Sequence, residues 1–186
     1  MSAPRLRKAE SFHGKTLVFR DACVGDAAFI HGLRSDEHKS RHLSPVSPRL
    51  ADQVAWLERY RDSTDQAYFI IQSASAEPLG TVRLYDAQGD SFCWGSWILK
   101  DQAPATAAIE SALMVYAYAV DALGFRDAHF QVRRDNQRVW AFHERFGAVR
   151  TGQDTTEFRY TLDNAAIRAA LHRYRRFLAQ PATAEV

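Results

Sequence analysis

The sequence predicts an α+β protein: one mixed, mostly antiparallel sheet flanked by helices in a single domain. Two observations lead to this class. The hydrophobic pattern changes from helical spacing to strand spacing and back along the chain, with a three-strand meander in the middle. The length of 186 residues is ordinary for one domain, and no stretch has the composition of a linker.

The first half of the chain is expected to hold a strand, two helices and the start of the meander. Residues 1–14 carry basic residues among polar ones and predict a flexible N-terminal arm. A hairpin turn containing Gly89 is expected over 86–90. In chain order, the expected strand, two helices and first two meander strands cover residues 16–20, 27–33, 50–61, 67–72 and 79–85.

The second half starts with the third meander strand, where Gly95 inside the strand predicts a bulge or a close backbone approach. Gly124 and Gly147 are expected to end two helices, and Asp135 to cap the second of them. The domain is expected to span 15–162, followed by a C-terminal helix and tail over 163–186. The expected strand, helix, strand, helix, strand and helix cover residues 92–99, 106–123, 129–132, 136–146, 158–162 and 164–178.

Composition narrows the class of protein. The hydrophobic fraction is 46%, the charged fraction 25% and the net charge +2, which are ordinary for a globular protein and favour neither nucleic acid nor a membrane as partner. Cys23 and Cys93 are isolated, with no metal-ligand spacing, so we expect no metal site and no disulfide framework. No signal-peptide pattern or apolar run of membrane-spanning length is present, and a cytoplasmic location is expected.

Two segments carry the functional argument: Trp97-Ile98-Leu99-Lys100-Asp101-Gln102-Ala103-Pro104-Ala105-Thr106-Ala107-Ala108, and Val132-Arg133-Arg134-Asp135-Asn136-Gln137-Arg138-Val139-Trp140-Ala141-Phe142-His143-Glu144-Arg145-Phe146-Gly147-Ala148. With the order strand, loop, long helix, strand and short helix, they resemble the GNAT acetyltransferases over roughly residues 16 to 162. The resemblance implies a GNAT-like fold, acetyl-CoA as co-substrate and a small-molecule amine as acceptor.

The resemblance also assigns a cofactor site. The pyrophosphate of CoA would lie against backbone N–H groups at the helix start, which are unpaired and at the positive end of the helix dipole. The chain departs from the family's loop pattern, because no glycine lies between Gly95 and Gly124. The implied cofactor-binding residues are Trp97, Ile98, Leu99, Ala105, Thr106, Ala107, Ala108, Asn136, Val139 and Phe142.

His143 stands where many members of the family carry a tyrosine that protonates the departing CoA thiolate, and histidine can do this work. Val139, Phe142, His143 and Phe146 also have the spacing of a buried helix face, so packing is the alternative role. Asn136 likewise has an alternative role as a helix-start residue. For the general base, the only candidates are Asp90, Glu110 and Glu144, acting through water.

The resemblance places the acceptor pocket between the first two helices and the meander, at Arg34, His42, Arg83 and Trp94. Arginine and histidine suit an anionic group, so the expected acceptor is an amino sugar, as in bacterial enzymes acting on nucleotide-linked amino sugars, or another small anionic metabolite. The alternatives are a protein N-terminal acetyltransferase, a CoA-binding protein without turnover and, through the basic C-terminal helix, nucleic-acid binding. A homodimer is also possible.

Overall fold

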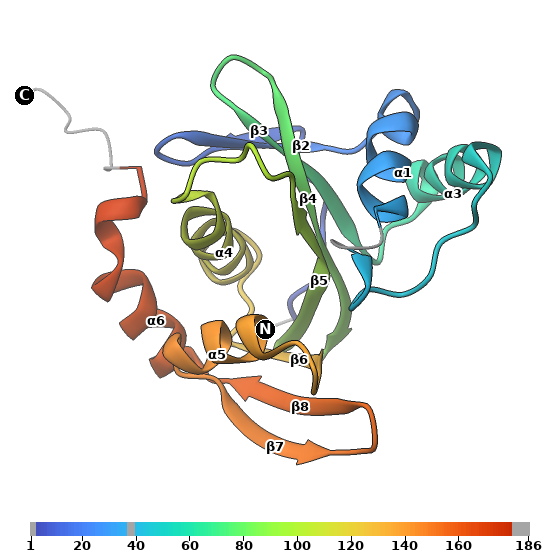
Figure 1. Ribbon diagram of the computed structural model, residues 1–186. Coiled ribbons are helices and arrows are strands. Elements are labelled where there is room, and N and C mark those ends of the chain that lie inside the picture. Colours follow the sequence, from blue (N-terminus) through green and yellow to red (C-terminus); the bar gives the residue numbers. More distant parts are fainter. Residues whose placement is uncertain (1–2, 37–39, 180–186) are drawn as a thin grey trace, which may run out of the picture.

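The computed structural model describes residues 3–36 and 40–179. Eight strands of this part form one sheet in the order β1-β2-β3-β4-β5-β6-β8-β7. Every neighbouring pair is antiparallel except β5 and β6, which pair in parallel. Helix α4 covers one face of the sheet, and α1 and α3 cover part of the other face (Figure 1). The predicted α+β class and the mostly antiparallel sheet are therefore confirmed.

The elements lie close to their predicted positions. The strands are β1 Ser11–His13, β2 Leu17–Asp21, β3 Ala67–Ser73, β4 Pro78–Gln88, β5 Ser91–Leu99, β6 Asp127–Arg133, β7 Val149–Gln153 and β8 Glu157–Leu162. The helices are α1 Ala27–Ser35, α3 Leu50–Asp62, α4 Ala107–Ala117, α5 Gln137–Arg145 and α6 Asn164–Arg173. A π-helical turn, Tyr118–Ala122, extends α4, and a 3-10 turn, Arg175–Phe177, follows α6.

The N-terminal segment differs from the prediction of a flexible arm. In its described part, Ser11–His13 form edge strand β1, which pairs with β2, and the Leu6 side chain is 3% exposed. The Lys8 ammonium donates to the carbonyls of Tyr60 and Arg61. The pattern missed this because single apolar residues spaced among polar ones carry no period, although each finds its own partner in the fold.

Three further local expectations were wrong. Strand β7 was not predicted, because most of its residues are exposed and its sequence lacks apolar alternation. Strand β4 continues to Gln88, so the hairpin turn is shorter than 86–90. Asn136, not Asp135, is the N-cap residue of α5, and the Asp135 carboxylate instead lies near His42 and Arg133. Gly124 and Gly147 do end helices as predicted, with φ of 84° and 98°.

Two hydrophobic cores lie on opposite faces of the sheet. The larger packs α4 and the buried side of α6 against the sheet, and includes Phe19, Phe69 and Tyr116. The smaller packs α1 and α3 against β3 through Ile30 and Leu57. Because α1 and α3 cover only this part of the sheet, the same face over β5, β6 and β8 is left open for a ligand.

The predicted bulge in β5 is confirmed, and beside it strands β5 and β6 stop pairing. Pairing of β4 with β5 shifts register between Thr81 and Arg83, and Ser96 has φ of 47°. The Thr81 hydroxyl holds the bulge by donating to the Ser96 carbonyl at 2.8 Å. Strands β5 and β6 pair only at Ser91↔Asp127 and Phe92↔Ala128, so beyond Phe92 the edge of β5 facing β6 has no strand partner. Backbone groups on this edge are free to bind an extended ligand.

Candidate active site

The end of β5 meets both cofactor-side helices at Trp97. Its indole Nε1 donates to Ser111 Oγ on α4 at 3.1 Å, and its ring centroid lies 5.3 Å from that of Phe142 on α5. Val139 and Phe142 are half-buried and pack on the main core, as do Trp97 and Leu99. The structure therefore brings together the strand end, the start of α4 and the apolar face of α5, as the resemblance implies.

The start of α4 has the properties of an anion site. Ala105 and Thr106 are exposed just before the helix, and Ala107 and Ala108 form its first turn. The Ala107 N–H already donates to the Pro104 carbonyl at 2.8 Å, so the other N–H groups at this helix start are those that the small side chains leave for an anion. The one carboxylate in this turn, Glu110, is 1% exposed and accepts hydrogen bonds from Thr16 N, Thr16 Oγ1 and Leu17 N. The Glu110 carboxylate is thus already hydrogen-bonded within the protein.

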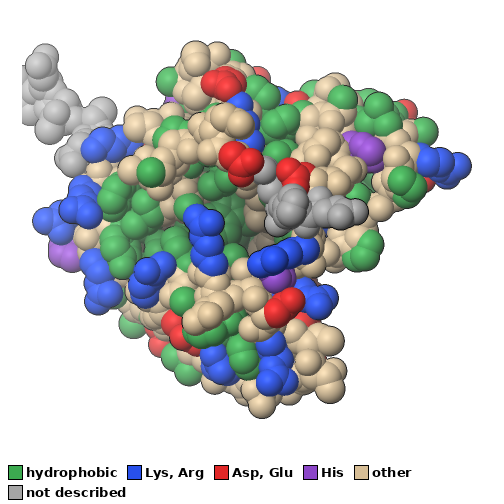
Figure 2. Space-filling model, in the orientation of Figure 1, with side chains coloured by type: hydrophobic (Ala, Val, Ile, Leu, Met, Phe, Trp, Pro, Cys, Tyr) green, Lys and Arg blue, Asp and Glu red, His purple; other side chains and the backbone are tan. Residues whose placement is uncertain are grey.

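The surface agrees with a cofactor of this shape. In Figure 2 apolar side chains are exposed in a recess beside α4, and Lys and Arg side chains border it. The unpaired edge of β5, the accessible N–H groups of α4 and this apolar recess match the amides, the phosphates and the aliphatic segments of CoA, respectively. The residues present therefore fit CoA.

Asn136 begins α5, directly after β6. Its backbone carbonyl accepts from Val139 N and Trp140 N, and these are the first backbone hydrogen bonds of the helix. Its side chain makes no capping hydrogen bond. The amide group is therefore available for another partner, a property that the helix-start alternative does not require.

His143 lies inside an aromatic cluster. Its ring centroid is 4.2 Å from that of Phe130 and 5.2 Å from that of Trp94, and the residue is 5% exposed. Burial lowers the pKa of its imidazole from 6.5 to about 3, so the ring is neutral at physiological pH. Its Nδ1 has no hydrogen-bond partner among the described residues. These contacts support the packing role of His143 directly. Its catalytic role stays a prediction, and the imidazole would have to perform it from the neutral state.

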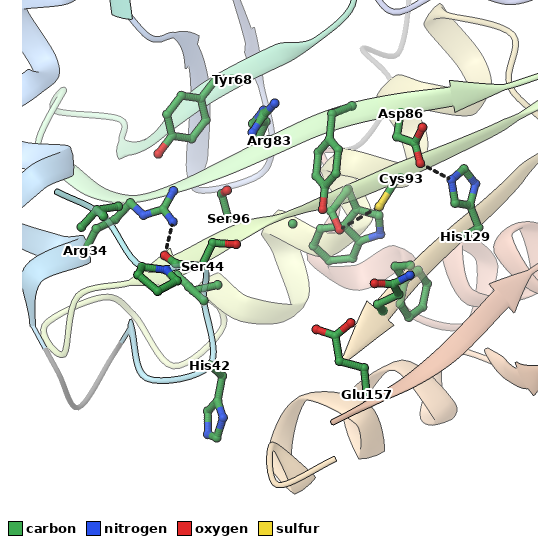
Figure 3. Close-up of a pocket in the computed structure, with 18 of the residues that line it drawn as sticks. Arg34, His42, Ser44, Tyr68, Arg83, Asp86, Cys93, Ser96, His129 and Glu157 are labelled. Atoms are coloured by element: carbon green, nitrogen blue, oxygen red, sulfur yellow. Dashed lines mark hydrogen bonds and ion pairs between the residues drawn. The ribbon is translucent and has the colours of Figure 1, made fainter. Parts of the chain in front are cut away.

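On the other side of β5 lies a cavity of about 860 Å³, between the α1/α3 side of the molecule and strands β4, β5, β6 and β8 (Figure 3). All four residues predicted for the acceptor, Arg34, His42, Arg83 and Trp94, line it. Gly95 and Ser96 of the bulge also line it, so the cavity reaches the strand whose other side faces the cofactor recess. An acceptor and an acetyl donor can therefore meet at β5.

The two arginines are held by uncharged neighbours. The guanidinium of Arg83 lies over the rings of Trp56 and Tyr85, at 5.4 and 4.8 Å from their centroids. Burial, chiefly, lowers the pKa of Arg83, and the nearby charge of Arg34 lowers it further. Arg34 donates to the Ser44 carbonyl at 2.9 Å. Neither arginine forms an ion pair with a carboxylate of residues 3–36 or 40–179.

His42 connects the loop after α1 to the turn before α5. Its side chain is 12% exposed, and Nδ1 lies 3.3 Å from a carboxylate oxygen of Asp135, without the angles of a hydrogen bond. The other ring nitrogen, Nε2, accepts from Arg41 Nε at 2.8 Å. His42 therefore forms part of the cavity wall with both nitrogens facing protein groups.

The candidates for a general base lie elsewhere. Glu110 is bonded to the β1–β2 region, and Glu144 accepts from Arg150 and from the Tyr160 hydroxyl. Neither these residues nor Asp90 lines the cavity. The Glu110 and Glu144 carboxylates are held by structural partners, and Asp90 lies outside the cavity, so a base acting through water would have to come from other residues.

Sequence reasoning missed several polar and aromatic residues of the cavity. On β6, His129 Nδ1 lies 2.7 Å from Ser91 Oγ, and its Nε2 lies 3.2 Å from Asp86 Oδ2. Asp86 has φ of 51°, a strained conformation for a residue other than glycine. The alternation of apolar and polar residues along each strand indicates which of these side chains share a face of the sheet. Only the order of the strands shows that they lie close together. The missed residues include Trp56, Tyr68, Asp86, His129 and Glu157.

Two classes of site are not seen in the described chain. Over residues 3–36 and 40–179, no group of three or more His, Cys, Asp or Glu side chains is arranged to hold a metal ion. No helix in the same ranges combines the length and the apolar character needed to cross a membrane.

Comparison with solved structures agrees with this geometry. The structure described as "Apo FdhC- a nucleotide-linked sugar GNAT" is 34% identical, with a TM-score of 0.82 over 91% of this chain and 98% of that one. A GCN5-related N-acetyltransferase from Brucella melitensis is 19% identical (TM-score 0.75; 96% and 90% covered). A spermidine N-acetyltransferase from Vibrio cholerae, in complex with CoA and spermine, is 16% identical (TM-score 0.74; 82% and 98% covered). The last two show the fold alone.

No curated protein matches the chain. The model of the acetyltransferase (GNAT) domain family, however, matches residues 16–149, which is more than half of the chain. With the open β5–β6 edge, the accessible start of α4 and the structural neighbours, this match is decisive: the chain belongs to the GNAT acetyltransferase family.

Proposed function

We propose that this protein is an acetyl-CoA-dependent N-acetyltransferase acting on the primary amine of an amino sugar linked to a nucleotide, or of another small anionic metabolite. The observation that carries the proposal is the pair Arg34 and Arg83. Both line the acceptor cavity, and neither is paired with a described carboxylate. Two such charges favour an anionic acceptor. The 34% identical structure described as a nucleotide-linked sugar GNAT supports the same class.

The cofactor-side residues have separate roles in this proposal. The N–H groups around Ala105 to Ala108 bind the pyrophosphate, and the free edge of β5 at Ile98 and Leu99 binds the pantetheine amides. The Asn136 amide contacts the CoA arm, and Trp97, Val139 and Phe142 provide an apolar wall. When bound, acetyl-CoA supplies an acetyl group activated as a thioester.

On the acceptor side, Arg34 and Arg83 hold the anionic group, while Trp94 and His42 shape the cavity. The amine must lose a proton before or during attack. In the described cavity Glu157 and the Asp86–His129 pair are the groups able to take it through water. His143 is the proposed proton donor to the departing thiolate. Because its imidazole is neutral, the ring would have to take up a proton that the amine loses as it passes one to the thiolate.

The test is a thiol-release assay with acetyl-CoA and four acceptor classes: nucleotide-linked amino sugars, free amino sugars, polyamines and short peptides. We expect turnover with anionic amino sugars and little with polyamines, because unpaired arginines repel a polycation. Preferential turnover of peptides would favour the alternative, a protein N-terminal acetyltransferase. CoA binding without turnover of any class would favour the other alternative, a CoA-binding protein of this fold.

The role of His143 needs its own measurement. If it protonates the thiolate, His143→Ala should lower kcat at least about tenfold with little change in KM for acetyl-CoA, and His143→Tyr should retain more activity. If it only packs, His143→Ala should lose stability but keep kcat per folded molecule. Homodimer formation and a cytoplasmic location stay predictions, testable by sedimentation and cell fractionation.

A further inference from the structure

Four residues that line the acceptor cavity have a buried polar atom without a hydrogen-bond partner among the described residues. His42 Nδ1 lies 3.3 Å from the Asp135 carboxylate, and the other three atoms are Arg34 Nε, Arg83 Nε and the hydroxyl oxygen of Tyr68. These three come from α1, β4 and β3, which are far apart in the sequence. All three can donate a hydrogen bond. Figure 3 shows the Tyr68 hydroxyl pointing toward Arg34, with Arg83 on the neighbouring strand.

The sheet register places Tyr68 beside Arg83. The two residues are cross-strand partners in the β3–β4 pair, and Tyr68 is 2% exposed. Burial raises the pKa of the Tyr68 phenol, whereas Thr81 and Arg34 nearby lower it. Both neighbours lie close enough to the hydroxyl to lower its pKa, but neither contact has the geometry of a full hydrogen bond. The Thr81 hydroxyl donates its own proton to the Ser96 carbonyl. The Tyr68 O–H therefore remains a neutral, buried donor.

An arrangement of this kind is unfavourable without a ligand. A buried donor without a partner is unfavourable, so three such donors near one another lower the stability of the free protein. The two guanidinium groups also repel each other. Their neighbours, the Trp56 and Tyr85 rings and the Ser44 carbonyl, hold them in place without neutralising them. An oxyanion is the ligand that would satisfy the donors and both charges together.

We propose that Tyr68 is a specificity-determining residue whose hydroxyl completes an oxyanion subsite with Arg34 and Arg83. This inference rests on the proposed function and assigns the subsite to the phosphate or carboxylate group of the acceptor. Arg83 is the cross-strand partner of Gly95 in the bulge, and neighbouring strands are about 4.8 Å apart. The subsite thus lies beside the strand where transfer takes place, and it fixes the distance between the anion and the amine.

The test measures anion binding without turnover. Inorganic phosphate, inorganic pyrophosphate and acetate are each titrated calorimetrically into enzyme saturated with CoA, so that the cofactor's phosphate site is filled. We expect wild type to bind at least one of them, and Tyr68→Phe to bind it at least about tenfold more weakly. The strongest of the three ligands identifies the anion as phosphate, diphosphate or carboxylate.

Tyr174→Phe is the matched control, because Tyr174 packs on Phe146 and does not line the cavity. It should bind the anion as wild type does. Tyr68→Phe should melt no lower than wild type, because the hydroxyl it removes has no described partner to lose. A merely structural Tyr68 predicts a lower melting temperature with unchanged anion affinity.

Two results would overturn the subsite. One is unchanged anion affinity in Tyr68→Phe, as expected if buried water satisfies the three donors. The other is no binding of any of the three anions by wild type. The proposed function fails separately: it fails if the acceptor panel shows no acetylation, even when anion binding depends on Tyr68. Acetylation of charged and neutral amines with equal kcat/KM in both wild type and Tyr68→Phe would instead remove the subsite and leave N-acetylation standing.

Discussion

The two sides of β5 bind their ligands by different means. On the cofactor side, the residues lie in one continuous stretch from Trp97 to His143, and the groups offered are mostly backbone N–H and C=O with small or apolar side chains. On the acceptor side, the cavity is lined largely by polar, charged and aromatic side chains from α1, α3, the loop between them and six of the strands. One side depends on local backbone geometry, and the other on which distant segments the sheet brings together.

This difference determines how each side responds to substitution. Backbone groups at a helix start survive most side-chain changes, so single substitutions on the cofactor side should have moderate effects. The acceptor side concentrates its charge in a few side chains, and removal of one of them should have a large effect. The three predictions below test this contrast, from the largest expected effect to the smallest.

Arg83→Ala should reduce kcat/KM for the anionic acceptor by about 100-fold, because it removes one partner of a buried charge contact. The KM for acetyl-CoA should stay within a factor of about two, since Arg83 lies on the acceptor side of β5. Steady-state kinetics on both substrates measures the two effects. Arg59→Ala, which removes an exposed arginine of the same cavity, is the control. An equal loss in both variants would mean that general charge, not the subsite, attracts the acceptor.

Asn136→Ala should weaken CoA binding by about tenfold, the value of one hydrogen bond, with little loss of stability. The reason is that its side chain makes no capping hydrogen bond, so the helix start keeps its backbone contacts. Calorimetric titration with CoA and thermal melting are the measurements. Asn164→Ala is the control, because Asn164 Nδ2 bonds Arg126 O at another helix start. A lower melting temperature with unchanged CoA affinity would make Asn136 structural.

The stability of the fold should fall as the pH falls below about 6.5, in part through His143. Its folded pKa of about 3 lies below the ordinary histidine value of 6.5, so the unfolded chain binds the extra proton over this range. Stability from this residue is complete above about pH 6.5 and decreases down to about pH 3. At pH 5.5 the decrease should be about 1 kcal/mol.

Denaturant unfolding of wild type and His143→Phe at pH 8 and pH 5.5 measures this effect. The phenylalanine variant should lose less stability than wild type over this range, by the stated amount. His172→Phe, which replaces a histidine on α6 whose side chain lies at the surface, should behave as wild type does. If the stabilities of wild type and His143→Phe change with pH by the same amount, His143 takes up its proton equally well in the folded and unfolded states. Burial would then not lower its pKa.

Local patterns in the sequence were sufficient for most of the fold. Helices α1, α3, α4, α5 and α6 follow apolar spacing, and Gly124 and Gly147 end helices because glycine adopts positive φ without strain. Gly95 correctly predicted the bulge in β5. These features depend on neighbouring residues alone, and the cofactor side is built almost wholly from them.

Tertiary structure decided the rest. Only the pairing of β3 with β4 puts Tyr68 next to Arg83, and only the packing of α1 brings Arg34 to the same point. Leu6 seemed to belong to a loose arm because its partners in the core lie elsewhere in the sequence, and β1 was missed because three residues are too few to show a strand pattern. Burial, which sets the pKa of His143 and leaves three donors without partners, is a property of the whole packed molecule. The sequence determined the elements and the cofactor side through local backbone preferences, while the acceptor chemistry arose from contacts between residues far apart in the chain.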